Sequence, residues 1–518
     1  MLKRMLLAVA GGAALGIGCV TAAFPLPLIG LVPLLLAISG SSRTSAAALG
    51  YFFGIVYYGF ALYAIFWESL PLSWTGIELT MSVQYGVTGV AWLFTAAILA
   101  LAPAVWASLA AGHDRTTSDI VVLPSVWVIL ECAASIVLSF ALAAPGIEIG
   151  PHIGIGHLGM LIADDIALLQ FSQLGGIFAL SFIVVVCNVA LYRLATAPTR
   201  ERKILAATAA ACVLAWAGAH AYIGSRAAPP GDFVVTALRS DAPLRLPAAS
   251  PSHRGHIEGI TSLMREARGS DIILLPEGSA YFTSAYVPSD DELRTIVGTS
   301  TVIVDSSILE RDGRMYRRLD YYDLDRGRSE FRYKHFLVPV GEYMPFAFRV
   351  IASLSGAGSA LDAITSNRHF ASGVAAAPVD VHDTAVAGLF CEELLSPTLY
   401  AGAARSGAEV FLNSSSLAWY RSSPTVYMQM LRAARVRAAE SRRFLVAAGD
   451  ASPAYALDWY GRIIAETAGG HDAIRVSVPA ATGQTPYSAL GLFVLLFPLI
   501  VVAIRYRASV ITAVARRH

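Results

Sequence analysis

One cysteine in this sequence stands apart from the other four. Cys391 is the only cysteine in the long polar stretch of the chain, and it lies in the run GLFCEE at residues 388–393. The remaining cysteines lie in apolar segments: Cys19, Cys132, Cys187 and Cys212. A lone cysteine that leaves an apolar strand and precedes acidic residues indicates a nucleophile rather than a disulfide partner. The alternative interpretation is a small buried core residue, the more common fate of a free cysteine.

Two further polar side chains lie beside apolar runs and would complete a set of chemical roles. Glu277 follows the run LLP at residues 274–276, and Lys334 lies in the run YKHFLVPVGEY at residues 333–343. A carboxylate can take the thiol proton, because the thiolate is the competent nucleophile. An ammonium can stabilise an oxyanion, and the thiolate can form an acyl-enzyme. Taken singly, a glutamate after a strand indicates a cap and a lysine in a loop indicates exposure. Together the three residues predict covalent catalysis at a thiol.

The elements around these residues predict a layered α/β domain. Short apolar runs alternate with helical stretches such as 426–442, a pattern typical of strands and helices that pack in layers. Reactive side chains commonly follow such strands, on loops that a rigid sheet holds. The runs are Phe233–Leu238, Ile272–Leu275, Thr301–Val304, Ala385–Phe390, Val410–Leu412 and Phe444–Ala448.

The remainder of the chain is too apolar for an ordinary soluble protein. Of its 518 residues, 55% are hydrophobic and 14% are charged, and an apolar run of about 17–25 residues can cross a bilayer as a helix. Eight such runs are expected, at about 5–21, 24–40, 46–67, 82–110, 118–143, 171–192, 204–223 and 487–504. We therefore expect a helical membrane domain at 1–224, a catalytic domain at 225–485, and a last membrane helix with a basic tail at 486–518.

The cationic residues predict the orientation in the membrane. If the N-terminus is cytoplasmic, the short loops on the opposite side, near 22–23, 68–81 and 144–170, contain no lysine or arginine. This follows the rule that cytoplasmic loops are enriched in cations, and it places the 225–485 domain outside the cytoplasm. The cytoplasmic set would be Lys3, Arg4, Arg43, Arg115, Arg193, Arg200, Arg202, Lys203, Arg505, Arg507, Arg516 and Arg517.

The composition also argues against several other function classes. A net charge of +1 gives no reason to expect nucleic acid as a partner. No phosphate-binding glycine motif and no metal-ligand spacing such as His-Glu-x-x-His is present. The membrane segments carry few charges, which weighs against a transporter, although a non-catalytic scaffold stays open as an alternative.

The motifs around the three polar residues resemble those of the nitrilase, or carbon–nitrogen hydrolase, superfamily. PE at 276–277, YKHFLVPVGEY at 333–343 and CEE at 391–393 look like its Glu–Lys–Cys motifs. Within that superfamily, the seven-plus-one helix arrangement resembles the apolipoprotein N-acyltransferase family. Smaller matches are GGIFALSF at 175–182 through Asn188, LPSVW at 123–127 with Glu131, and GQTPY at 483–487.

This resemblance implies an αββα sandwich fold and a role for each residue. Glu277 would be the general base and Cys391 the nucleophile, while Lys334 and the backbone N–H of Glu392 would stabilise the oxyanion. Glu342 and Glu393 would be auxiliary acids that orient Lys334 and the substrate amine. Tyr343 and Trp419 flank the motifs and could line an acyl groove, although domain core is the equally open alternative.

The resemblance also implies the reaction and the location. An acyl chain would leave a phospholipid, form a thioester on Cys391, and pass to the α-amino group of the lipid-modified N-terminal cysteine of an apolipoprotein. No cofactor and no metal are implied, and we expect a monomer in the bacterial inner membrane with its catalytic domain on the periplasmic side.

Three segments depart from the family pattern and leave the acceptor open. They are 140–146, FALAAPG, 238–241, LRSD, and 413–420, NSSSLAWY. A membrane-anchored amidase in which water takes the acyl group, or a paralogue with another amine acceptor, are the alternatives. The acyl chain and headgroup preferences cannot be derived from the sequence.

Overall fold

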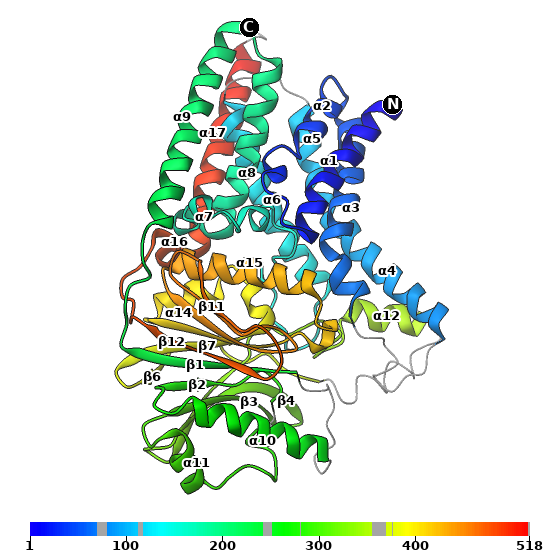
Figure 1. Ribbon diagram of the computed structural model, residues 1–518. Coiled ribbons are helices and arrows are strands. Elements are labelled where there is room, and N and C mark those ends of the chain that lie inside the picture. Colours follow the sequence, from blue (N-terminus) through cyan, green and yellow to red (C-terminus); the bar gives the residue numbers. More distant parts are fainter. Residues whose placement is uncertain are drawn as a thin grey trace.

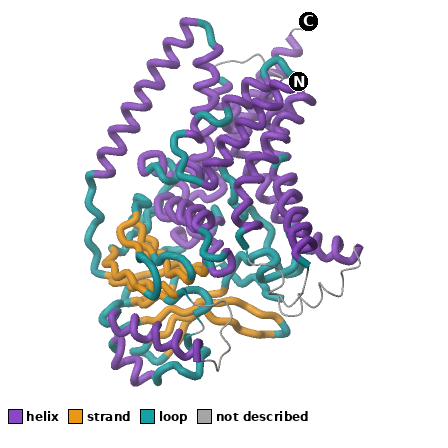
Figure 2. Tube along the Cα trace, turned by 45° about the vertical axis from the view of Figure 1, so that its right-hand side comes forward, coloured by secondary structure: helices purple, strands orange, loops and turns teal. Residues whose placement is uncertain are grey.

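The computed structural model describes residues 1–69, 80–111, 118–241, 251–279, 281–354, 369–375 and 377–515. A bundle of long helices forms one end of the molecule, and a β-sheet domain forms the other (Figure 1). The N-terminus and the C-terminus both lie at the end of the bundle that is remote from the sheet. Figure 2 shows the same division, with strands confined to one end and long helices above them.

The bundle consists of helices that are long and apolar enough to cross a membrane. In the described residues seven candidate spans are present, and a shorter apolar helical segment covers Leu26–Ile38, so a multi-pass membrane domain is confirmed. Arg115, Arg516 and Arg517 of the predicted cytoplasmic set lie outside the described residues. The main helices of the bundle are α1 (Leu2–Val20), α3 (Arg43–Trp67), α4 (Met81–Leu99), α5 (Leu101–Ala111), α6 (Asp119–Ala141), α8 (Ser172–Thr196), α9 (Thr199–Gly224) and α17 (Leu496–Ala515).

The second expected span, 24–40, is not one continuous helix. The structure has a short 3-10 turn, η1 (Leu26–Leu28), and then a seven-residue helix, α2 (Val32–Ile38). Pro25, Pro27 and Pro33 interrupt this run, since a proline inside a helix removes a backbone donor and clashes with the preceding turn. The side chain of Asn188 on α8 compensates, because it accepts the N–H of Leu31 at 2.7 Å and donates to the carbonyl of Pro27 at 2.9 Å. Hydropathy therefore predicted a membrane segment here but not its broken backbone.

Helix α8 is also interrupted, at a point where the C-terminal segment packs against it. Gly175 and Gly176 have non-helical backbone angles inside the helix, and Gly176 has a φ of +60°. A Cβ atom on Gly176 would lie 2.5 Å from the ring of Tyr487, which belongs to α16 (Pro486–Leu490). The hydroxyl of Tyr487 in turn donates to the carbonyl of Pro397 in the sheet domain. Only glycine fits both the backbone conformation and the space at position 176.

We expect Gly176→Ala to destabilise the protein by about 1–3 kcal/mol from backbone strain, with a further cost from the contact with Tyr487. The measurement is the thermal unfolding midpoint of the detergent-solubilised protein. Gly218→Ala is the matched control, because Gly218 lies on α9 and a Cβ there meets nothing within 4 Å. Equal midpoints for the two variants would show that the break does not need glycine.

The other end of the molecule is built on one sheet, which has twelve strands in the described residues. The path of neighbouring strands is β5-β4-β3-β2-β1-β9-β8-β7-β6, while β12 pairs with β1, and β10 pairs with β9 and β11. The strands are β1 (Phe233–Ser240), β2 (Ile272–Leu274), β3 (Val302–Arg311), β4 (Arg314–Asp323), β5 (Arg328–Tyr333), β6 (Val379–Val381), β7 (Thr384–Phe390), β8 (Val410–Ser416), β9 (Phe444–Asp450), β10 (Tyr455–Leu457), β11 (Ile463–Glu466) and β12 (Asp472–Val478).

The sheet folds into a sandwich because its two halves are joined by only two residue pairs. Strands β1 and β9 meet at Arg239 with Gly449 and at Ser240 with Asp450. Side chains from both halves fill one apolar interior, which includes Val235 and Val304 from one half and Val386 and Leu412 from the other. Alternate strand residues point to opposite faces, so each half must also cover an outer face.

Helices cover both outer faces, and this gives the four layers. Helices α10 (Pro251–Glu266) and α11 (Asp290–Val297) pack on the β1–β3 half. Helices α14 (Leu399–Arg405) and α15 (Pro424–Ser441) pack on the β7–β9 half. The predicted fold class, a helical membrane bundle with an αββα sandwich, is confirmed. The division into 1–224, 225–485 and 486–518 stays a proposed domain organisation.

Helix α15 forms the layer between the sheet and the bundle (Figure 1). The guanidinium of Arg432 on this helix contacts the carboxylate of Asp164 at 2.7 Å and the carbonyls of Gly18 at 2.7 Å and Thr21 at 3.0 Å. Its side chain is only 2% exposed, so these bonds satisfy a charge that would be costly to bury alone. The sandwich is therefore held directly against the membrane helices.

Candidate active site

Cys391 lies where a buried strand ends and a short helical turn begins. Strand β7 ends at Phe390, and η4 (Cys391–Leu395) follows at once. The cysteine is 6% exposed, and its thiol donates to the carbonyl of Ser416 over 3.8 Å. Ser416 ends the parallel neighbour strand β8. The segment 413–420, which departs from the family pattern, therefore contacts the sulfur.

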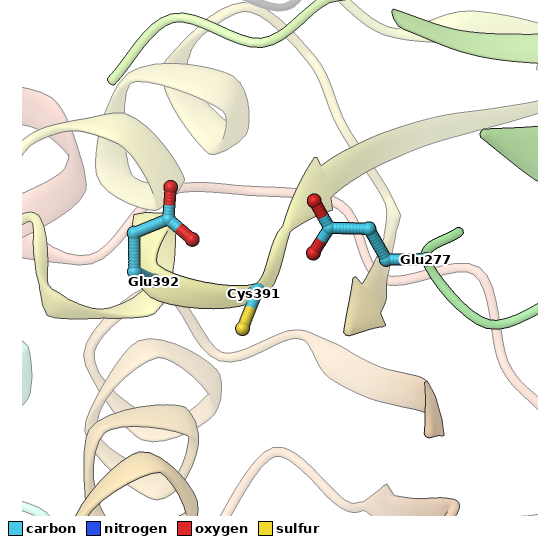
Figure 3. A group of neighbouring side chains, drawn as sticks. All are labelled: Glu277, Cys391 and Glu392. Carbon is cyan, nitrogen blue, oxygen red and sulfur yellow. The ribbon is translucent and has the colours of Figure 1, made fainter. Parts of the chain in front are cut away.

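Glu277 and Glu392 flank Cys391 from opposite sides (Figure 3). One carboxylate oxygen of each and the sulfur all lie within 4.8 Å of one another. Glu277 follows β2, and the next residue, Gly278, has a φ of +82°, a turn that glycine adopts without strain. This turn carries Glu277 from one half of the sandwich to a cysteine on the other half.

Lys334 follows β5 and is surrounded by three carboxylates. Its Nζ lies 2.7 Å from Glu392, 2.9 Å from Glu342 and 3.5 Å from Glu277. The side chain is 1% exposed. Burial alone would lower the pKa of Lys334, but the three carboxylates outweigh burial and hold that pKa well above its usual value. The residue is therefore an ammonium in the site.

The thiol of Cys391 is protonated in the resting state. Burial raises the pKa of Cys391, and the charges of Glu277 and Glu392 raise it further, against the opposing effect of Lys334. The net pKa lies well above that of a free thiol. A thiolate therefore forms only if a base takes the proton as the reaction proceeds.

Arg317 is a second cation in the site, and sequence reasoning missed it. Its guanidinium contacts Glu342 at 2.8 Å and Glu277 at 3.5 Å. The signal that could have revealed it is the alternation of side chains between the two faces of β4. Arg317 lies on the same face as the buried residues Leu319 and Tyr321. An arginine in register with an inward-facing pair points into the sandwich rather than to solvent.

Glu342 and Glu393 are both buried near Lys334, but they make different contacts. Glu342 accepts from Lys334 and from the N–H of Val338, both at 2.9 Å. Burial would raise its pKa, but Lys334 and Arg317 outweigh burial and hold the pKa of Glu342 below its usual value. Glu393 accepts only backbone N–H groups among the described residues, from His335 at 2.8 Å, Phe336 at 3.1 Å and Phe390 at 2.8 Å. It thus ties the backbone after Lys334 to the strand that carries Cys391.

The two predicted aromatic residues lie around this cluster. Tyr343 is 4% exposed and packs with Leu337 and Phe370 in a small apolar cluster. Trp419 is half-buried in the turn η5 (Ala418–Tyr420) that follows β8. The burial of Tyr343 favours the domain-core interpretation for that residue.

The donor set of Glu277, Cys391 and Glu392 could in principle attract a metal ion. Two cations already neutralise these groups, since Lys334 contacts Glu392 at 2.7 Å and Arg317 contacts Glu277 at 3.5 Å. A divalent cation would be repelled by both at close range. We therefore assign no metal to the site.

Membrane-domain residues pack directly against the site. Ala64 and Ile65, near the end of α3, share one apolar cluster with Cys391 and Leu394. The connection between α6 and α8 also contributes, because Glu148 pairs with His335 at 3.0 Å and the ring of His152 stacks on Phe336 at 4.0 Å. The cysteine therefore lies at the junction of the sandwich and the bundle.

The fold and these residues define a class of protein, namely a carbon–nitrogen hydrolase domain mounted on a membrane-helix bundle. Residues 242–482 match the family model of carbon–nitrogen hydrolase. Among solved structures, a carbon–nitrogen hydrolase superfamily protein from Xanthomonas campestris with an arsenic adduct in its active site is 16% identical, over 48% of this chain and 91% of that chain, with a TM-score of 0.35. An amidase from Nesterenkonia sp. AN1 is also 16% identical, over 48% of this chain and 93% of that chain, with a TM-score of 0.35.

The helical part makes the assignment narrower. Residues 11–190 match the model of the apolipoprotein N-acyltransferase N-terminal domain. The apolipoprotein N-acyltransferase of Geobacter metallireducens is 27% identical over 465 residues, which cover 85% of this chain and 82% of that protein. That of Bordetella bronchiseptica is 33% identical over 177 residues, 32% of this chain and 31% of that protein. The chain belongs to the apolipoprotein N-acyltransferase family, within the carbon–nitrogen hydrolase superfamily.

Proposed function

We propose that this protein is a membrane N-acyltransferase that acts on lipoproteins. An acyl chain passes from a phospholipid to the sulfur of Cys391 and then to the α-amino group of a lipid-modified N-terminal cysteine. Family membership supports acyl transfer to lipoproteins in general. The observation that carries the proposal is that Cys391 shares an apolar cluster with Ala64 and Ile65 of a membrane helix, so the nucleophile lies where a lipid acyl chain can reach it.

In the first half-reaction, Glu277 takes the proton of Cys391 as the sulfur attacks the ester carbonyl of the phospholipid. The Lys334 ammonium stabilises the oxyanion together with the backbone N–H of Glu392, and collapse of the intermediate releases the lysophospholipid. In the second half-reaction the amine attacks the thioester, the amide forms, and the thiol is restored. Glu342 and Glu393 act as positioning residues, because the first holds Lys334 directly and the second holds the backbone beside it.

The orientation proposed here follows from the two ends of the bundle. Lys3, Arg4, Arg200, Arg202 and Lys203 lie in segments at the end that is remote from the sheet. Cations at that end favour a cytoplasmic location for it. The catalytic domain then faces the periplasm of the bacterial inner membrane, and we propose that the protein acts as a monomer.

We expect Glu277→Gln to lower the rate of acylation of Cys391 by about 10²–10⁴-fold, the range for loss of a general base. The thiol would then lose its proton acceptor, and burial already disfavours the thiolate. The measurement is the mass of the intact protein after incubation with phospholipid. The protein without the substitution is expected to gain the mass of one acyl group.

Glu258→Gln is the control for this experiment. Glu258 lies on α10 of the same domain, forms an exposed pair with Arg254 and contacts no residue of the site. An acyl adduct that forms equally fast in Glu277→Gln would exclude Glu277 as the base. Adding a diacylglyceryl peptide then separates transfer from hydrolysis, since an acyl-peptide product supports the proposal and free fatty acid alone supports a hydrolase.

A further inference from the structure

The side chain of Glu392 occupies a position that the backbone role assigned above does not explain. Its carboxyl lies on the opposite side of Cys391 from Glu277 (Figure 3), and both carboxyls lie within 4.8 Å of the sulfur. Glu392 is also the most exposed of the three acids on Lys334, with 20% of its side chain exposed, compared with 12% for Glu277 and 7% for Glu342. It is therefore the acid that an incoming substrate meets first.

The ammonium of Lys334 is crowded by three carboxyls in this arrangement. It donates a hydrogen bond to Glu342 at 2.9 Å, and the carboxyls of Glu392 and Glu277 lie 2.7 and 3.5 Å from its nitrogen. An oxyanion that approaches the ammonium closely must therefore displace one of these carboxyls. The geometry shows which of the three is free to leave.

Glu342 and Glu277 have additional partners, whereas Glu392 does not. Glu342 is held by Arg317 at 2.8 Å and by the N–H of Val338 at 2.9 Å, and Glu277 is held by Arg317 at 3.5 Å. Among the residues that the structure describes, Lys334 is the one ion-pair partner of Glu392. The oxygen of an arriving ester can thus displace Glu392 from Lys334 and leave its carboxyl beside the reacting carbon.

Once it is displaced from Lys334, the carboxyl of Glu392 is expected to take up a proton. Burial raises the pKa of Glu392, the charges of Glu342 and Glu277 raise it further, and Lys334 is the cation that opposes them. Two carboxyls on either side of one thiol, one with a proton and one in position to accept one, form an acid–base pair.

We propose that the Glu392 side chain is a second proton-transferring group, the acid of the first half-reaction and the base of the second. This inference rests on the acyl transfer proposed above and adds a catalytic residue to it. It also accounts for a glutamate directly after the nucleophile.

The protons balance over the two half-reactions. In the first, the thiol proton passes to Glu277, the sulfur–carbon bond forms, the ester carbon–oxygen bond breaks, and Glu392 protonates the departing glycerol oxygen. In the second, the amine nitrogen bonds to the acyl carbon and gives a proton to Glu392, the sulfur–carbon bond breaks, and Glu277 returns its proton to the sulfur. The site ends the two half-reactions in the state in which it bound the ester, with a thiol, a protonated Glu392 and an unprotonated Glu277.

The test compares two acyl donors that differ only in the leaving group. The full-length protein in detergent is incubated with a phospholipid or with the p-nitrophenyl ester of the same fatty acid, and the acyl adduct on Cys391 is followed by intact mass. Nitrophenolate leaves without a proton, so it does not need a general acid. We expect Glu392→Gln to slow acylation by the phospholipid about 10²-fold or more and to leave acylation by the nitrophenyl ester within about threefold of the unchanged protein.

Glu277→Gln is the comparison variant, since loss of the base is expected to slow acylation by both donors. Equal slowing by both donors in Glu392→Gln would show that Glu392 only positions Lys334, and no slowing by either would exclude any role; each result overturns the inference. The thermal unfolding midpoint of each variant reports folding, so equal slowing counts against the inference in a variant that keeps the midpoint of the unchanged protein. If the unchanged protein forms no adduct with either donor, the proposed acyl transfer fails, and the role of Glu392 fails with it.

Discussion

Replacing Cys391 with alanine is expected to abolish acyl transfer, with a loss of at least about 10⁴-fold, as for removal of other covalent nucleophiles. The charged groups around the sulfur are carboxylates, an ammonium and a guanidinium, and the nearby hydroxyls of Ser415 and Ser452 are far weaker nucleophiles than a thiolate. The measurement has two parts, acyl-peptide formation from phospholipid and the acyl adduct by intact mass. Both should be lost, while the thermal unfolding midpoint changes little, since the substitution removes one sulfur atom from a buried site.

The control is a cysteine outside the site. Cys212 lies exposed on α9 of the bundle, so Cys212→Ala should retain full activity and the adduct. Cys391→Ser should resemble Cys391→Ala in transfer, because a hydroxyl is a far weaker nucleophile at neutral pH. Residual acyl transfer in Cys391→Ala at more than about 1% of the original rate would exclude a thioester on this residue.

Replacing Lys334 with methionine should have the second largest effect, a loss of about 10³-fold in acylation, at the upper end for removal of one oxyanion donor. Methionine retains an apolar stem in a place where the side chain is 1% exposed, and only the charge is lost. The variant should also be less stable by about 3–5 kcal/mol, because loss of the cation leaves buried carboxylates uncompensated. Acylation is measured by intact mass and stability by thermal unfolding.

The pH dependence of this stability loss has a definite sign. In the unchanged protein Lys334 and Arg317 hold the pKa of Glu342 below its usual value, so this group adds stability above its unfolded pKa and loses it as the pH falls through the folded pKa. Without Lys334 the pKa of Glu342 rises, and an ionised Glu342 then destabilises the folded state because its buried charge has lost a partner. The loss of stability should therefore be larger at pH 8 than at pH 5. Lys203→Met, at an exposed position on α9, should show no such difference.

Several features of the fold could be predicted because they depend on local pattern. Apolar length alone identifies the membrane segments, and it is independent of which helices pack together. The alternation of short apolar runs with helical stretches predicted the layered domain, since each strand must bury at least one face. Pro25, Pro27 and Pro33 carried the signal for the broken second segment, but hydropathy averages over a window and does not register single prolines.

Some residues of the site could be predicted from the sequence, and others could not. The positions of Glu277 and Cys391 were predicted because each comes after an apolar run that becomes a buried strand. Lys334 was singled out by the motif that it begins, since the strand before it is polar. Arg317 was missed because it lies inside a strand with several other arginines, where only the phase of burial separates an inward side chain from an outward one. For Glu392 the backbone N–H was considered, but the contact of its side chain with Lys334 depends on a turn conformation that residue types do not reveal.

The sequence by itself determined which residues can carry charge, a proton or an acyl group, and which segments must leave water, because these are properties of residue type and local period. Only the tertiary structure decided that β2, β5 and β7 bring their ends to one point, since strands from distant parts of the chain become neighbours through the strand order of the sandwich. It also decided that this point lies beneath α3 of the bundle. The contact of Lys334 with Glu342 at 2.9 Å depends on how the layers pack together, and packing is a property of the whole fold.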